Sequence, residues 1–148
     1  MNIFEAIRKD HDVQRELLDR LLATEGASPQ RKEIYQELKD HLKTHALAEE
    51  RYFYNPLMKH DISQPKARHS VAEHNELDEI MADLDEMEMS SPGWLTRAKT
   101  LAERLRHHLE EEEREVFQIA GRALKEKHKE ELADAYRGTM KDKLDDHA

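Results

Sequence analysis

Hydrophobic residues recur at intervals of three and four positions along most of the chain, and this spacing places them on one face of a helix. Four long segments carry such a stripe, with polar residues on their other faces. We therefore predict helices over residues 2–25, 29–57, 65–88 and 92–120. The apolar stripes contain Phe4, Ile7, Leu18 and Leu21, then Ile34, Leu38, Leu42 and Tyr52, then Leu77, Met81 and Leu84, and finally Trp94, Ala98, Leu101, Leu105 and Val116.

The breaks between the stripes contain residues that end and begin helices. Gly26 closes the first segment, and Ser28 followed by Pro29 begins the second, because serine caps a helix and proline suits its first position. Ser91 and Pro92 repeat this arrangement before the fourth segment. Four amphipathic helices with short connections predict an all-α fold, an antiparallel up-down-up-down four-helix bundle.

A fifth helix is predicted at residues 124–143, after Gly121. We expect residues 1–122 to form the bundle domain and residues 123–148 to form a C-terminal helical extension. We interpret the extension as a lid or a partner-facing appendage.

Composition and charge exclude several classes of function. A chain of 148 residues fits one domain, and its net charge of −9 disfavours nucleic acid as a partner. The absence of cysteine excludes disulfides, thiolate nucleophiles and cysteine-ligated metal sites. No apolar run approaches the roughly 18 residues of a membrane span, and the first residues lack the apolar core of an export signal. We therefore expect a cytoplasmic protein without a membrane partner.

Ionisable residues interrupt the apolar stripes at six positions. The second and fourth helices each carry a histidine followed four residues later by a glutamate, so that both side chains share the inward face. The first and third helices each add one histidine. Burying these groups is costly unless they have partners. The six residues are His11, His45, Glu49, His74, His108 and Glu112.

These six residues belong to an internal repeat. One and the same offset in the sequence separates His11 from His74, His45 from His108, and Glu49 from Glu112, since 74 − 11, 108 − 45 and 112 − 49 are equal. A single histidine on an apolar stripe is more often a core residue than a ligand. One offset shared by three pairs of polar residues instead predicts two helical hairpins that each supply the same ligand set.

The ligand types indicate a metal centre. Imidazole with carboxylate suits iron, manganese or zinc, and two shared carboxylates suit two ions about 3.5–4 Å apart. Two octahedral ions offer about twelve positions, of which four histidines and two bridging glutamates fill about eight. The positions left open predict a small-molecule ligand such as dioxygen, peroxide or nitric oxide.

Other polar residues near the six carry weaker signals. Glu50, Glu73 and Glu113 adjoin candidate ligands and are interpreted as outer partners or surface residues, with direct ligation as the less favoured alternative. Tyr52 and Tyr54 lie about one turn beyond Glu49; either could contact the site, although ordinary packing is the expectation.

The other histidines are not predicted to be ligands. His41 is predicted to lie at a helix edge. His107 has the spacing to pair with Glu111 but lies off the apolar stripe of its helix. The remaining histidines are predicted to be solvated: His60, His69, His128 and His147.

The order of these motifs resembles the hemerythrin-like, or HHE cation-binding, domain. The resemblance covers residues 3–120 and rests on His11, on His45-x-x-x-Glu49, on His74 and on His108-x-x-x-Glu112. It implies a four-helix bundle that holds two iron ions in a non-haem centre with an oxo or hydroxo bridge; manganese or zinc are alternatives. Oxygen-carrying members of this family use a His-x-x-x-His pair on the third helix, but Ser70 stands one turn before His74.

Those carriers also use an aspartate five residues after the last histidine, where this chain has Glu113, with Glu112 at four. The symmetric pattern is similar to that of bacterial hemerythrin-like proteins, for which sensing, iron handling, and peroxide or nitric oxide chemistry are suggested. The ferritin-like bundle would need Glu-x-x-His pairs, which the chain lacks.

Three functions follow as hypotheses. The first is a di-iron protein that binds or senses dioxygen or a related small molecule, or that handles iron. The second is a redox enzyme that acts on peroxide or nitric oxide. The third is a metal-independent helical interaction module that uses the fifth helix, with a protein partner or a second copy of the chain.

Overall fold

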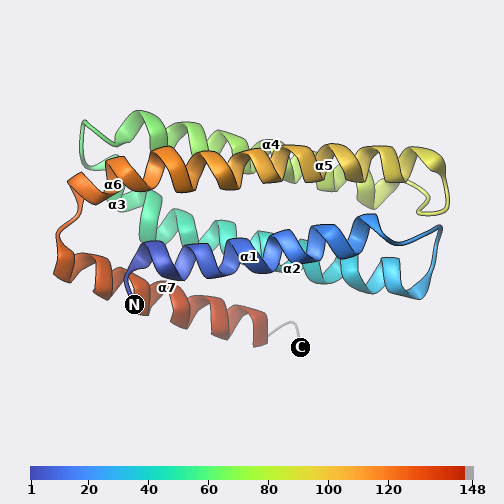
Figure 1. Cartoon of the computed structure of the whole chain (residues 1–148), viewed down its shortest axis with the longest axis horizontal. Coiled ribbons are helices and arrows are strands. Elements are labelled where there is room, and N and C mark those ends of the chain that lie inside the picture. The colour runs from blue at the N-terminus through green and yellow to red at the C-terminus, as the bar shows by residue number, and fades with distance from the viewer. Residues whose placement is uncertain (146–148) are drawn as a thin grey trace.

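The computed structural model describes residues 1–145 as a bundle of antiparallel helices with no strand in that range (Figure 1). One hairpin pairs two helices in the N-terminal half and a second pairs two helices in the C-terminal half. The four long helices are α1 (Ile3–Leu22), α2 (Pro29–Glu49), α4 (Gln64–Glu86) and α5 (Pro92–Glu111). The predicted bundle is confirmed, and the helix ends agree with the prediction to within a few residues.

Side-chain caps define where the helices begin. Asn2 accepts a hydrogen bond from the backbone of Glu5, whose side chain bonds the Asn2 backbone in return. The hydroxyl of Ser28 accepts from the backbone of Arg31, and that of Ser91 accepts from the backbone of Trp94. The serine–proline breaks read from the sequence are therefore helix starts.

A π-helical turn lies at each of the two glutamates on the inward face, beginning directly after Glu49 in one case and at Glu112 itself in the other. The segment η1 (Glu50–Tyr54) continues α2 into α3 (Asn55–Met58), and η2 (Glu112–Val116) continues α5 into α6 (Phe117–Ala123). The predicted helices at 29–57 and 92–120 each contain one of these turns, which were not predicted from the sequence. In each π turn a backbone carbonyl bonds the amide five residues on, which widens the helix and rotates the following side chains.

Two apolar layers pack on either side of a polar layer. One contains Leu17, Leu18, Leu21, Leu38, Leu84, Trp94 and Leu101, among others. The other contains Ile3, Ile7, Phe53, Leu57, Val116, Phe117 and Tyr136, among others. On each of the four bundle helices the polar positions lie between these two sets, so the core encloses the candidate site from both ends.

The fifth helix, α7 (Glu126–Asp145), packs across α1 and α2 (Figure 1). Its inner face buries Leu132, Ala133, Tyr136 and Met140. Of the two interpretations, a lid or a partner-facing appendage, this packing leaves no apolar side of α7 for a partner, because that side is covered by the bundle. The division of the chain at residue 122 remains a prediction, and the prediction for His147 falls outside the described residues.

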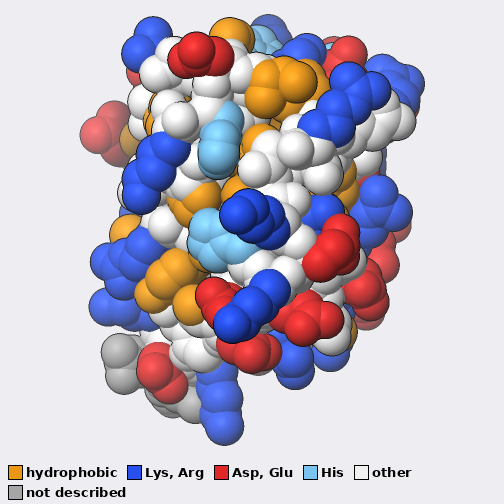
Figure 2. All heavy atoms as spheres, turned by 90° about the vertical axis from the view of Figure 1, so that its left-hand side faces the viewer, with side chains coloured by type: hydrophobic (Ala, Val, Ile, Leu, Met, Phe, Trp, Pro, Cys, Tyr) orange, Lys and Arg blue, Asp and Glu red, His pale blue; other side chains and the backbone are white. Residues whose placement is uncertain are grey.

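The surface is mixed in charge. Figure 2 shows the end of the bundle at which α3 and α6 lie, where lysine and arginine side chains alternate with aspartate and glutamate and apolar side chains are scattered. Of the helices in the described part of the chain, none combines the length and apolar character required to cross a bilayer.

Candidate metal centre

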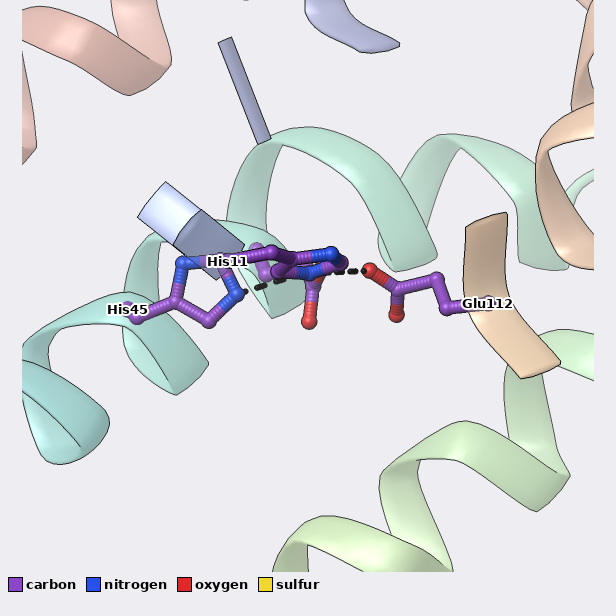
Figure 3. Close-up of side chains that lie close together, drawn as sticks. His11, His45 and Glu112 are labelled. Carbon is purple, nitrogen blue, oxygen red and sulfur yellow. Dashed lines mark ion pairs between the residues drawn. The ribbon is translucent and has the colours of Figure 1, made fainter. Parts of the chain in front are cut away.

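The six predicted residues meet inside the bundle. All six are buried: residue exposure is 0% for His11 and Glu49 and no more than 5% for the others. Figure 3 shows His11, His45 and Glu112 pointing toward one another from α1, α2 and the start of η2. Their convergence follows from the stripes, because each residue replaces an apolar side chain on an inward face.

All four imidazoles turn the same ring nitrogen, Nε2, toward the two carboxylates. The Nε2 atom of His11 lies 3.1 Å from Glu112, and that of His74 lies 3.1 Å from Glu49. The two His-x-x-x-Glu pairs are slightly wider, at 3.5 Å for His45 with Glu49 and 3.7 Å for His108 with Glu112. Donor atoms bound to one first-row ion at about 2.1 Å are separated by about 3.0–3.4 Å, so these spacings fit metal ligands.

The inward atoms lack hydrogen-bond partners. Within the described residues, seven buried side-chain nitrogen or oxygen atoms are unpaired, and six of them belong to this set. They are Nε2 of His11, His45 and His108, both carboxylate oxygens of Glu49, and one oxygen of Glu112. An unpaired buried polar atom is costly, and cations at the centre of the cluster would satisfy all six together. The residues present therefore fit a metal centre.

The cluster divides into two subsites that share Glu49. One comprises His11, His45, Glu49 and Glu112, and the other comprises Glu49, His74 and His108. Within each subsite the donor atoms lie within 4.8 Å of one another. A carboxylate common to both is the arrangement expected of a ligand that bridges two ions.

Each imidazole also has an acidic partner on its outer nitrogen, Nδ1. His11 donates to Glu113 at 2.6 Å, and His108 donates to Glu73 at 2.8 Å. His74 faces Glu50 at 3.4 Å. An outer carboxylate keeps the proton on Nδ1, which leaves the Nε2 lone pair free for a metal. The expectation that these three glutamates are outer partners agrees with their positions.

The fourth imidazole, His45, has a more elaborate outer partner. Its Nδ1 lies 2.5 Å from the hydroxyl of Tyr136 on α7, and that hydroxyl in turn donates to Asp10. Asp10 directly precedes His11, as Glu73 directly precedes His74, so the two carboxylates are equivalent in the repeat. The role of Tyr136 was not predicted, because α7 lies outside the repeat; the spacing of Leu132, Tyr136 and Met140 marks the apolar face of α7 but not what that face packs against.

The sequence model described as the Hemerythrin HHE cation binding domain matches residues 2–120. The chain belongs to the hemerythrin HHE cation-binding domain family. The whole structure is similar to a crystal structure of an HHE domain-containing protein from Mycobacterium kansasii, with a TM-score of 0.88 and 22% sequence identity. The match covers 97% of this chain and 87% of that one, so α7 has a counterpart in that fold. No curated protein sequence matches the chain.

The two central carboxylates of this HHE domain differ in acidity. Burial raises the pKa of Glu112, and the neighbouring Glu49 raises it further. Burial also opposes ionisation of Glu49, but the adjacent His45, together with His74, holds its pKa well below the usual value. Two buried carboxylates side by side therefore favour a state with one negative charge when no cation is bound between them.

The imidazoles of the HHE site hold protons strongly. Burial disfavours the charged form of His45, but Glu49 and Asp10 outweigh it and raise its pKa to about 10. The pKa of His74 rises to about 9 against the same burial cost, mainly through Glu49 and Glu50. The pKa of His11 shifts in the same direction through Glu112 and Glu113. The additional proton of each charged imidazole occupies Nε2, the nitrogen that a metal ion would need.

Tyr54 contacts the site directly, which is the less favoured of the two alternatives that the sequence left open. Its hydroxyl donates to the carboxylate of Glu112, and burial keeps its pKa well above the usual value, so it stays protonated. The π turn explains this contact, because it brings the residue five positions after Glu49 onto the inward face. Ser70, which stands where oxygen carriers have their extra histidine, faces the same hydroxyl. Tyr52 instead bonds Thr139 on α7.

A small cavity of about 20 Å³ adjoins the HHE site on the side of the first apolar layer. Its lining includes Gln14, His45, His74 and His108, with leucine and methionine side chains around them. Gln14 is fully buried and its side-chain oxygen has no partner within the described residues, while its nitrogen lies 3.4 Å from Nδ1 of His41. His41 is buried too, which corrects its prediction as a helix-edge residue; burial and the neighbouring His45 lower its pKa to about 4.

Proposed function

We propose that this chain is a non-haem di-iron protein that binds or senses dioxygen or a related small molecule. Membership of a cation-binding family supports metal binding. The observation that carries the proposal is the set of six unpaired, inward-facing donor atoms on five of the candidate ligands. Two candidate subsites joined through Glu49 favour a pair of ions over a single one.

The six residues have distinct roles in this proposal. Glu49 and Glu112 would bridge the ions, His11 and His45 would complete one subsite, and His74 and His108 the other. The three outer glutamates and the Tyr136–Asp10 pair would orient the imidazoles. Two iron ions would supply a redox-active centre with open coordination positions.

The adjoining cavity supports a ligand of two or three atoms. A volume near 20 Å³ exceeds the roughly 10–15 Å³ that one water molecule requires, and it is too small for a metabolite. Three of the four candidate imidazoles line it. A molecule the size of dioxygen, nitric oxide or peroxide could therefore reach the centre without displacing a protein side chain.

Optical spectroscopy tests this proposal. Protein loaded anaerobically with ferrous iron is exposed to dioxygen or to nitric oxide, and the near-ultraviolet absorption is followed. We expect a new absorption band with either ligand in the wild type and a diminished band in His74→Ala, which removes one ligand of the second subsite. No spectral change with either gas would overturn the small-molecule proposal.

A second candidate is a redox enzyme that acts on peroxide or nitric oxide. The polar groups beside the centre favour it, because the Tyr54 hydroxyl and the Gln14 amide can exchange hydrogen bonds with a ligand that carries protons. Peroxide disproportionation by the iron-loaded protein is the test. Peroxide turnover should fall sharply in His74→Ala, and unchanged turnover in that variant would contradict the enzymatic proposal.

A further inference from the structure

A second His-x-x-x-Glu pairing lies on the outer face of the bundle. His69 and Glu73 occupy α4, and His107 and Glu111 occupy α5, each pair spaced four residues apart as in the buried site. The two helices are neighbours in the bundle, so the four side chains form one cluster. We call His69, Glu73, His107 and Glu111 the α4–α5 cluster.

The distances within the α4–α5 cluster suit a metal ion. The Nε2 atom of His69 lies 3.3 Å from Glu111 and 3.6 Å from Glu73, and the Nε2 atom of His107 lies 3.2 Å from Glu111. Donor atoms arranged tetrahedrally at about 2.1 Å from zinc are separated by about 3.4 Å. The donor atoms of His69, Glu73 and Glu111 lie within 4.8 Å of one another.

The carboxylates of this cluster have an unusual set of partners. Their side chains are only 16% and 14% exposed, whereas the imidazoles are open to solvent. Across residues 1–145, every ion pair found for Glu73 and Glu111 is with a histidine, and no lysine or arginine neutralises them. Other surface acids on the bundle pair with arginine instead, as Asp83 does with Arg97. The negative charges of these two largely buried carboxylates are therefore balanced only by histidines, which are neutral or weakly basic.

The internal repeat does not explain the cluster. The positions of the first half that are equivalent to His69, His107 and Glu111 hold Ala6, Thr44 and Ala48. Only Glu73 has an acidic counterpart, Asp10. The carboxylate of Asp10 is covered by Tyr136 from α7. Within the described residues no helix covers Glu73 in the same way, and this carboxylate faces an exposed imidazole instead.

We propose that the α4–α5 cluster is a separate surface site for one divalent first-row cation such as zinc or ferrous iron. The converging donors, one imidazole and two carboxylates, are of the types these ions prefer, and His107 contacts the second oxygen of Glu111 beside them. Glu73 joins this site to the buried one, because one of its oxygens faces His69 and the other accepts from Nδ1 of His108. A chain of contacts thus runs from a surface ion through Glu73 and His108 to the buried carboxylate of Glu112.

Zinc titration followed by equilibrium dialysis and metal analysis tests the site. The matched variants are His69→Ala/His107→Ala, which removes both exposed imidazoles, and His60→Ala/His128→Ala, which removes two exposed histidines elsewhere. We expect the wild type and the His60/His128 variant to bind one more zinc per chain than the His69/His107 variant. Glu111→Gln should weaken that zinc at least tenfold while leaving the bound iron unchanged.

The comparison does not depend on the buried centre. Iron-loaded protein and metal-free protein are both titrated, and the difference of one zinc between the two double variants is expected in either state. Equal zinc content in the wild type and the His69/His107 variant, in either state, overturns the surface site. A buried site that fails to hold iron would appear separately, as an iron content below that of the proposed pair.

Discussion

The hydroxyl of Tyr136 lies 2.5 Å from Nδ1 of His45, although the two residues are far apart in the sequence. This contact places the C-terminal helix in direct touch with the candidate metal centre. It also breaks the pseudo-twofold symmetry of the outer partners, since the equivalent imidazole, His108, meets a carboxylate without an intervening tyrosine. The helix that follows the bundle is thus part of the site's construction, and the hypothesis of a metal-independent module using a free fifth helix loses its main support.

Replacing Tyr136 with phenylalanine should weaken iron binding. The variant keeps the ring but removes the hydroxyl that accepts from His45 and donates to Asp10. Loss of such an outer partner costs about 10–100-fold in metal affinity. Competition with a chelator measures the effect. Tyr52→Phe is the control, because it removes a hydroxyl that bonds α7 through Thr139 without touching an imidazole; equal affinity in the two variants would contradict the role of Tyr136.

Iron affinity should rise with pH well beyond neutrality. In the metal-free protein His45 and His74 keep their protons up to pKa values of about 10 and about 9. Metal needs the neutral imidazoles, so binding at pH 7 must displace both protons. Apparent affinity should therefore fall by about 100-fold for each pH unit below 9, which follows from two displaced protons. Chelator competition at pH 6, 7 and 8 checks the slope, and an affinity that is flat between pH 7 and 8 would contradict it.

Removal of iron should lower the melting temperature. A ligand that binds only the native state at 1,000 times its dissociation constant stabilises by about 4 kcal/mol. For a domain of this size each kcal/mol shifts the midpoint by about 2–4 °C, so a loss of about 10 °C is expected. Calorimetry of loaded and stripped protein measures it. Glu49→Gln/Glu112→Gln should show no such difference, and identical midpoints in the wild type would favour a purely structural cluster.

Gln14→Leu should alter ligand binding without altering iron content. The equivalent position in the second half of the repeat is Leu77, so this change makes the two halves of the cavity alike. It also removes the one unpaired buried side-chain atom of the described chain that lies outside the six candidate ligands. We expect nitric oxide affinity of the iron-loaded protein to change by about tenfold, roughly the value of one hydrogen bond. An unchanged affinity with full iron content would show that the amide does not face the ligand.

The buried site could be predicted from the sequence because its residues follow both the helical spacing and the internal repeat. Helical spacing put each of the six residues on an inward face, and the shared sequence offset linked the two halves. Glu50, Glu73 and Glu113 could be named because each directly adjoins a candidate ligand. Their positions on the outer nitrogens needed the structure.

Helical spacing and the internal repeat do not determine the features that were missed. Tyr136 and Gln14 have no polar counterpart in the repeat, and Tyr136 depends on how α7 docks. The two π turns lie at the repeated sequences Glu49-Glu50-Arg51 and Glu112-Glu113-Arg114, but the repeat by itself does not distinguish a π turn from an α turn. The contact of Tyr54 with Glu112 depends on the first of these turns, and α-helical spacing alone would have turned that ring away.

Metal content per chain tests the central claim most directly. The wild type and Glu49→Gln/Glu112→Gln are loaded anaerobically with ferrous iron, desalted and measured by mass spectrometry of the metal. If six side chains enclose two ions through the two glutamates, the wild type retains two iron ions per chain and the variant retains fewer than one. Fewer than one iron in the wild type, or two in the variant, would contradict the account.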